Sequence, residues 1–189
     1  MSSPEVLIIE SKSPSDHFEG RHEGYILQQI LHLEGVRSQY LEVIDEKHFE
    51  KALKKAENNS IKFIHFSCHG SNDGIQLTNG TFLTWKDLDV IAWPILKDKC
   101  LVFSSCLVGK GVERLFDNHK TFCNAIIAPT KIITWGEGIV AYSAFYHKAK
   151  SPETTTESDV RVMNAIVGAG TFSLIKSQTR NTIYTIGAQ

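Results

Sequence analysis

A histidine and a cysteine, each placed just after a short apolar run, are the residues of this chain best suited to covalent chemistry. Residues 63–66 are apolar and lead to His69, and residues 101–103 are apolar and lead to Cys106. Runs of this kind are typical of strands buried in a parallel sheet, and the carboxyl ends of such strands meet at one edge. The pattern therefore predicts a thiol beside an imidazole, which could take up its proton.

Gly70, which follows His69 directly, is the third candidate. Because glycine has no Cβ, we expect the backbone to turn sharply there and to present its N–H group to the crevice. Together with the N–H group of Cys106 it would form an oxyanion hole, a pair of donors for the negative oxygen that develops during attack on a carbonyl.

The first half of the chain alternates strand and helix patterns, with residues 11–20 as a loop. This order predicts a right-handed, mostly parallel α/β sheet. Strands are expected at residues 6–9, 37–44, 62–68 and 100–104, helices at 22–33, after the N-cap Asp45 and at 85–96, and a small hairpin at 75–77 and 81–83.

The second half continues the same pattern. A Gly-Lys-Gly turn at 109–111 is expected to lead into a helix, and residues 172–176 fit either helix or strand. Strands are expected at residues 125–128, which 132–133 could extend, and at 182–186, with helices at 136–150 and 159–167 and an exposed loop at 151–158. Neither a repeat nor a linker divides the sequence, so we expect one domain over residues 1–189.

Composition narrows the classes of function. The chain has 189 residues, a formal net charge of −1, 42% hydrophobic residues and four cysteines without a CxxC pair. The sequence has no basic patch of the kind that predicts a nucleic-acid partner, and no apolar run in it is long enough for a signal peptide or a membrane span. We expect a soluble, cytoplasmic protein without disulfides, in which Cys68, Cys100 and Cys123 are buried.

Two other kinds of site compete with the cysteine–histidine pair. A zinc site could be assembled from His65, Cys68, His69, Cys106 and His119, but no paired ligand spacing supports it. Alternatively, the α/β scaffold could act as a binding module, or as an inactive scaffold that works through protein–protein contacts. Glycine-rich nucleotide-binding motifs are absent from the sequence.

The two central blocks resemble the caspase-like cysteine peptidases, most closely the CHAT branch, whose domains are often attached to helical repeats. Residues 63–70 and 101–109 carry the resemblance, with weaker matches at 125–146 and 184–187. It implies a three-layer α/β/α sandwich, a catalytic dyad of His69 and Cys106, and no cofactor or metal. It also implies a protein or peptide substrate, cleaved through a thioester intermediate.

The chain departs from the caspase pattern at the nucleophile. The expected Gln-Ala-Cys, with histidine about 50 residues upstream, is replaced by Ser-Ser-Cys at 104–106, and His69 lies 37 positions before Cys106. In similar enzymes the residue two before the nucleophile helps to select the substrate residue before the scissile bond (P1), but Ser104 is neutral. Asp73 and Glu137 could line a pocket for a basic P1 residue, or could be plain surface acids.

The sequence also bears on how the expected activity would be regulated. The sequence leaves little room for a processing linker after Cys106, and no regulatory domain is evident. We therefore expect that an activating or regulatory partner chain controls the activity.

Overall fold

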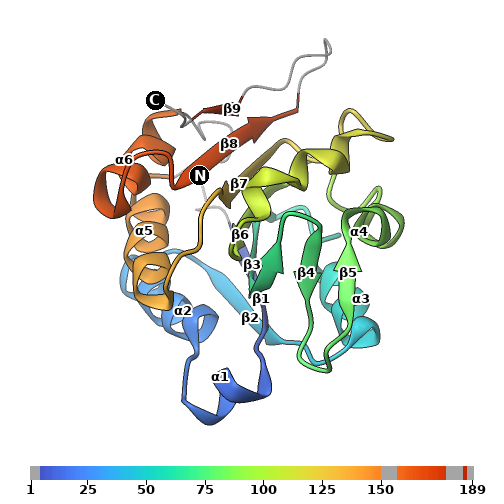
Figure 1. Ribbon diagram of the computed structural model, residues 1–189, viewed down its shortest axis with the longest axis horizontal. Helices are drawn as coiled ribbons and strands as arrows, with labels where there is room; N and C mark the ends of the chain where they lie inside the picture. The colour runs from blue at the N-terminus through green and yellow to red at the C-terminus, as the bar shows by residue number, and fades with distance from the viewer. Residues whose placement is uncertain (1–4, 150–156, 178–184, 187–189) are drawn as a thin grey trace.

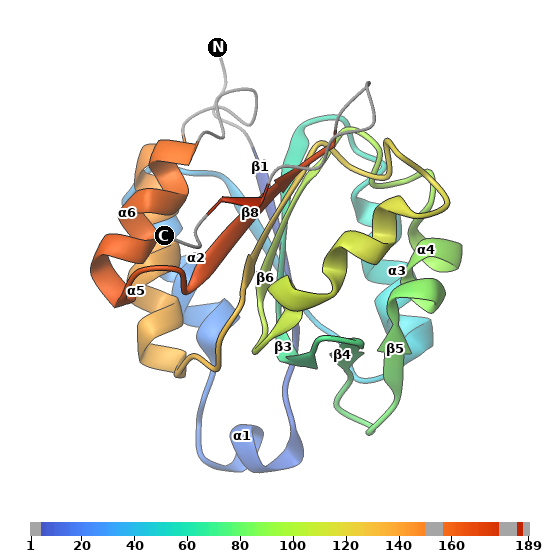
Figure 2. The same ribbon diagram turned by 45° about the horizontal axis from the view of Figure 1, so that its top comes forward.

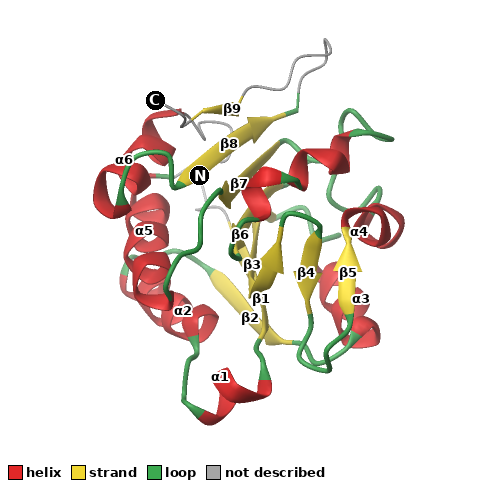
Figure 3. Ribbon diagram, viewed as in Figure 1, coloured by secondary structure: helices red, strands yellow, loops and turns green. Residues whose placement is uncertain are grey.

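A mostly parallel sheet forms the middle layer of the protein. The computed structural model describes residues 5–149, 157–177 and 185–186, and within them nine strands belong to one sheet (Figures 1 and 3). The main order is β2-β1-β3-β6-β7-β8-β9, parallel up to β7 and antiparallel beyond it, with the hairpin β4–β5 attached to β3. The bounds are β1 (Glu5–Ser11), β2 (Ser38–Glu42), β3 (Ile61–Ser71), β4 (Gly74–Gln76), β5 (Phe82–Thr84), β6 (Cys100–Ser104), β7 (Ala125–Pro129), β8 (Phe172–Lys176) and β9 (Thr185–Ile186).

Helices cover both faces of this sheet. Figure 2 shows α2 (Glu23–Leu33), α5 (Trp135–Lys148) and α6 (Glu157–Val167) on one side, and α3 (Glu46–Lys55) and α4 (Trp85–Ala92) on the other. The core is accordingly split in two, with one apolar cluster between the sheet and each helical layer. The predicted α/β/α sandwich is confirmed.

The register between β3 and β6 explains the spacing of the candidate pair. The two strands run parallel, and the last paired residues are Ser67 and Ser104. His69 and Cys106 each lie two residues beyond this pair. Because side chains alternate between the faces of a strand, both are set toward the same face of the sheet. The 37-residue separation of His69 and Cys106 is therefore the same as that of the paired residues Ser67 and Ser104.

Two expectations about the elements near the site were wrong. Residues 11–20 are not all loop, because Ser13 caps a short helix, α1 (Pro14–Phe18), with Pro14 in its first turn. The third strand does not end at Cys68, since β3 runs through His69 and Gly70 to Ser71 and pairs with β4. The helix expected after the Gly-Lys-Gly turn is present as a short 3₁₀-helix, η2 (Val112–Phe116), and another one, η1 (Val108–Lys110), precedes it.

Elsewhere most elements agree with expectation, with shifts at their ends. The predicted N-cap is confirmed, since the Asp45 carboxylate accepts a hydrogen bond from the His48 N–H group. Residues 172–176 form a strand, whereas residues 132–133 do not extend β7, and α4 ends at Ala92 rather than at residue 96. Most of the loop expected at 151–158, and residues 182–184 of the last expected strand, lie outside the described residues.

Candidate active site

His69 and Cys106 line one small pocket of about 60 Å³ at the carboxyl ends of β3 and β6. The His69 side chain is 43% exposed, and Cys106 is half-buried, with its thiol 3.5 Å from the carbonyl oxygen of Ile133. The remaining lining residues are Cys68, Ser104, Ile133, Thr134 and Trp135. The thiol and the imidazole therefore share a pocket that is open to solvent.

The backbone turns sharply directly after Cys106. Leu107 has a φ of 62°, the left-handed conformation that side chains other than glycine rarely adopt. Its N–H group donates a hydrogen bond to the carbonyl oxygen of Lys131, 3.2 Å away. A conformation of this kind costs about 1–3 kcal/mol and persists only where surrounding contacts hold it. The turn ends β6 and leaves Cys106 at the edge of the sheet.

Asp16, on α1, is the functional candidate that the sequence did not reveal. Its Oδ2 lies 2.5 Å from His69 Nε2, and the carboxylate also accepts hydrogen bonds from Ser13 Oγ (2.5 Å) and Arg21 Nη1 (2.7 Å). Burial alone would raise the pKa of Asp16, but these hydrogen bonds from Ser13, His69 and Arg21 outweigh it and hold the pKa well below its usual range. Asp16 is therefore a carboxylate at neutral pH.

The signal that could have found Asp16 is local. A serine followed by proline and, three residues on, by an acid is a helix-start pattern, and here it reads Ser13-Pro14-Ser15-Asp16. It predicts that the acid is fixed close to the cap, although not that it faces His69.

The carboxylate fixes how the His69 ring can act. An ionised carboxylate can only accept a hydrogen bond, so His69 Nε2 must carry the shared proton. In the neutral imidazole the other nitrogen, Nδ1, is then unprotonated and able to act as a base. The edge-to-face contact of the ring with Trp135, at 5.6 Å between ring centroids, also restrains its orientation.

Asp16→Asn is expected to lower kcat/KM for peptide cleavage by about 100-fold, because a neutral amide neither holds the Nε2–H tautomer nor stabilises the imidazolium.

The low pKa of Asp16 also affects the stability of the fold. The contribution of the carboxylate to the free energy of unfolding is present at neutral pH and is lost as the pH falls below about 4, the ordinary pKa of aspartate. Urea unfolding should therefore separate wild type from the variant at pH 7, and the two curves should converge in acid.

The matched control for this variant is Asp45→Asn. Asp45 also caps a helix with its carboxylate, but it stands at the start of α3 and does not line the pocket. Its replacement should leave kcat/KM unchanged. Equal activity of Asp16→Asn and wild type would remove Asp16 from the site.

Gly70 is required for space rather than for a turn. Its φ is not in the left-handed region, and a Cβ at this position would lie 2.8 Å from Val108 Cγ2 and 2.9 Å from Ser105 Cβ. The expectation of a sharp turn at Gly70 was therefore wrong. Hydrogen-bonded and non-hydrogen-bonded pairs alternate along an antiparallel hairpin; counting from the closing pair Ser71–Gly74, Gly70–Ile75 is non-hydrogen-bonded, which leaves the Gly70 N–H group outside the hairpin's ladder.

Gly70→Ala is expected to lower the free energy of unfolding by about 1–3 kcal/mol, the usual cost of inserting a methyl group into a packed site. Chemical denaturation measures this directly. The matched control is Gly136→Ala in the first turn of α5, where a Cβ would meet nothing within 4 Å. Alanine is the better helix former, so the control should be neutral or slightly stabilising. Equal stability of the two variants would contradict this packing account.

The three residues proposed to contact substrate are not brought together. Ser104 is buried and lines the pocket beside Cys106. Asp73 lines a different hollow and forms an exposed ion pair with Arg114, with 2.9 Å between Oδ1 and Nη1. Glu137 is exposed and closes the capping box of α5 by accepting hydrogen bonds from the N–H group and hydroxyl of Thr134. These hydrogen bonds lower the pKa of Glu137.

The other polar residues near the pocket have separate environments. Burial raises the pKa of the Cys68 thiol to about 12, which keeps it protonated, and its Sγ lies 3.2 Å from Ser105 Oγ. His119 is bound to Asp89 and stacks on Trp93. Within the described residues, no group of three or more histidine, cysteine, aspartate or glutamate side chains could hold a metal ion. In the same part of the chain, no helix has the length and apolar character of a membrane span.

The arrangement of the sheet has a counterpart among solved structures. No protein-family model and no curated protein sequence matches the chain. The fold is that of the caspase-like α/β proteins, as one structural neighbour shows. That neighbour is the gingipain RgpB of Porphyromonas gingivalis, a cysteine peptidase of clan CD, in a complex of its pro- and mature domains. The TM-score is 0.55 at 13% sequence identity, and the match covers 89% of this chain and 46% of that chain.

Proposed function

We propose that the protein is a cysteine endopeptidase in which Cys106 is the nucleophile and His69 is the general acid and base. One observation carries the proposal: Cys106 shares a solvent-accessible pocket with a histidine whose Nε2 is bound to a buried carboxylate. A nucleophile, a base and a third group that orients the base form the arrangement that activates a thiol.

Each step follows from these positions. His69 Nδ1 takes the thiol proton of Cys106, and the thiolate sulfur attacks the carbonyl carbon of the scissile bond. The N–H groups of Gly70 and Cys106 donate hydrogen bonds to the resulting oxyanion. The C–N bond then breaks as His69 returns its proton to the leaving amine. Water, deprotonated by the same nitrogen, hydrolyses the thioester and regenerates the thiol.

The narrower assignment is to the CHAT branch of the caspase-like peptidases, with a protein or peptide as substrate and a partner chain that controls activity. The blocks at residues 63–70 and 101–109 support the branch. The structural neighbour was solved as a complex of pro- and mature domains, which is a precedent for a protein partner in this fold. A purified chain that cleaves its natural substrate at full rate by itself would contradict control by a partner.

A positional library of fluorogenic peptides, incubated with the purified chain, tests the proposed function. We expect cleavage of a defined subset of peptides, and none with Cys106→Ala. Cleavage that continues in the variant would assign the activity to other residues. If neither protein cleaves, with or without cell extract as a source of activator, the alternative of an inactive scaffold is favoured.

A further inference from the structure

The short helix α1, which carries Asp16, is not anchored by apolar packing. Asp16 is the one buried residue of this helix, and neither apolar cluster of the described residues includes any residue of Pro14–Phe18. Its large apolar side chain, that of Phe18, is 92% exposed. Figure 2 shows the helix beyond the end of the sandwich, between β1 and α2. The place of the Asp16 carboxylate therefore depends on polar contacts.

The hydrogen-bond partners of Asp16 within its own segment cannot fix that place. Ser13 and Arg21, which donate to its carboxylate, belong to the same connection between β1 and α2 and would move together with it. The helix itself contributes one ion pair with the sheet, between His17 Nδ1 and Glu42 Oε1 at 3.6 Å, but this pair is exposed. Exposed pairs contribute little to stability, so a stronger contact is needed.

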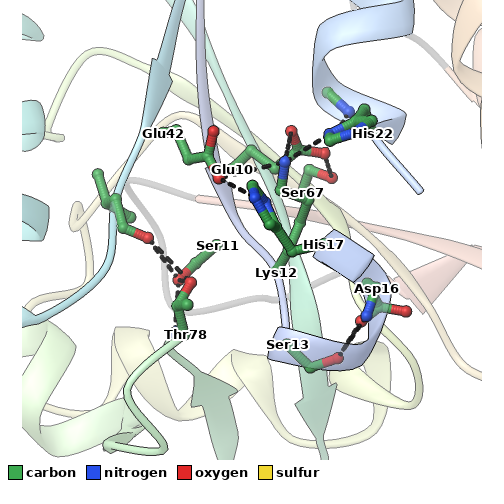
Figure 4. Close-up of polar contacts among 12 residues, drawn as sticks. Glu10, Ser11, Lys12, Ser13, Asp16, His17, His22, Glu42, Ser67 and Thr78 are labelled. Atoms are coloured by element: carbon green, nitrogen blue, oxygen red, sulfur yellow. Dashed lines mark hydrogen bonds and ion pairs between the residues drawn. The ribbon is translucent and has the colours of Figure 1, made fainter. Parts of the chain in front are cut away.

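Lys12 joins both ends of this segment to the sheet. It directly follows β1, and its buried Nζ lies 2.5 Å from Nδ1 of His22, the residue directly before α2. The same Nζ lies 3.2 Å from Glu42 Oε1 at the end of β2 and 3.8 Å from Glu10 Oε2 on β1. Figure 4 shows Lys12 in the middle of these side chains. One amine thus links β1, β2 and the start of α2.

Burial makes this contact stronger than the exposed pair of His17. A charged amine that is taken out of water is tolerated only where acceptors and anions surround it. Lysine has donors and no acceptor, so Nδ1 of His22 accepts the hydrogen bond. Glu10 is itself held in place, since it accepts hydrogen bonds from the Gly24 N–H group and from Tyr40. A displacement of the segment would separate His22 from Lys12 and leave the buried amine with fewer partners.

We propose that Lys12 is a positioning residue of the active site. By binding His22 and Glu42, it holds the segment between β1 and α2 where Asp16 meets His69. The inference rests on the proposed function, because it concerns the base of the same dyad. Lys12 does not line the catalytic pocket and therefore acts through Asp16.

Nitrogen NMR of the imidazole rings measures the tautomer of His69 without any substrate. Wild type should carry the proton on Nε2. Lys12→Met, which keeps an unbranched side chain without the charge, should give a mixture of tautomers, as should Asp16→Asn. The matched control is Lys99→Met, which also removes a buried lysine. Lys99 donates to two backbone carbonyl oxygens beside the amino end of β3, so its replacement should leave the His69 signals unchanged.

Steady-state kinetics measures the consequence for cleavage. Lys12→Met should lower kcat by about 10- to 100-fold, the effect of a small misplacement of a catalytic group. KM should stay within about two-fold, because no binding contact with the substrate is lost. Combined with Asp16→Asn, the variant should cause no further loss. A loss that adds to that of Asp16→Asn, with the tautomer of His69 unchanged, would make Lys12 a merely structural residue and overturn the inference.

Glu42→Gln decides the question if Lys12→Met does not fold. The Glu42 side chain is 40% exposed, and glutamine removes the charge that it shares with Lys12 and His17. The tautomer and kcat should change in the same direction as in Lys12→Met. The matched control is Glu34→Gln, since Glu34 is 39% exposed and is likewise paired with a histidine, but at the C-terminal end of α2. It should have no effect on either measurement.

The two measurements separate this inference from the proposed function. A His69 tautomer that depends on Lys12 and Glu42, in a protein that cleaves no peptide, would support the positioning role and reject the peptidase. Cleavage at the wild-type kcat with an unchanged tautomer in the folded variants would keep the peptidase and overturn the role of Lys12.

Discussion

Replacing Cys106 by alanine is expected to lower kcat/KM for peptide cleavage by about 10⁴-fold or more. No other group in the pocket can replace it, because the second thiol there, that of Cys68, is held protonated by burial. Loss of a nucleophile typically removes nearly all of the chemical rate enhancement. The fold should persist, since Cys106 is half-buried at the sheet edge and its thiol makes a single weak hydrogen bond, to Ile133.

Cys68→Ala is the matched control for this prediction. Cys68 also lines this pocket, but its thiol lies beside Ser105 Oγ. The Cys68 side chain is on the face of β3 opposite to that of His69. Its kcat/KM should remain within a few-fold of the wild-type value, measured on the same peptide and with thermal unfolding as a check on folding. If Cys68→Ala removed the activity and Cys106→Ala did not, the assignment of the nucleophile would be reversed.

Replacing His69 by alanine is expected to lower kcat/KM by about 10³- to 10⁴-fold. Without the imidazole, no group in the pocket takes the thiol proton or returns it to the leaving amine, and the carboxylate of Asp16 loses the partner through which it acts. The loss of kcat/KM should exceed the roughly 100-fold loss expected for Asp16→Asn. That variant keeps the imidazole base and changes only the group that is hydrogen-bonded to it.

A double variant measures whether His69 and Cys106 act as one unit. Residues that act as one unit have strongly non-additive effects on rate. The double variant Cys106→Ala with His69→Ala should therefore be no less active than Cys106→Ala alone. A further large drop in the double variant would mean that His69 contributes to some reaction that Cys106 does not perform.

The placement of His69 beside Cys106 was predictable because it depends on two regular features. Both apolar runs form parallel neighbouring strands, and the two reactive residues stand at equivalent positions beyond them. Where the pattern of side chains decides the structure, as in buried strands, a single sequence is informative. The same reasoning failed at Gly70, since glycine has two uses, a turn or a close approach, and only the positions of Val108 and Ser105 distinguish them.

Asp16 could not be found in this way. It lies within the first turn of a helix, where acidic residues are common and are usually solvated. Its burial and its contact with His69 depend on where α1 lies relative to β3, which no local pattern specifies. Conversely, Asp73 and Glu137 were considered because an acid could bind a basic P1 residue, yet both are held in local contacts at the surface.

Covalent labelling of the native protein measures whether His69 activates the thiol of Cys106. The purified chain is incubated with a set of peptidyl electrophiles that react with thiolates and differ in the residue next to the reactive group. The adduct is located by mass spectrometry. We expect a single adduct, on Cys106. Its formation should be much slower in His69→Ala, and should fall to the rate of a free thiol after the protein is unfolded in urea. Labelling of Cys106 at the same rate in wild type, in His69→Ala and in the unfolded chain would mean that His69 does not activate this thiol.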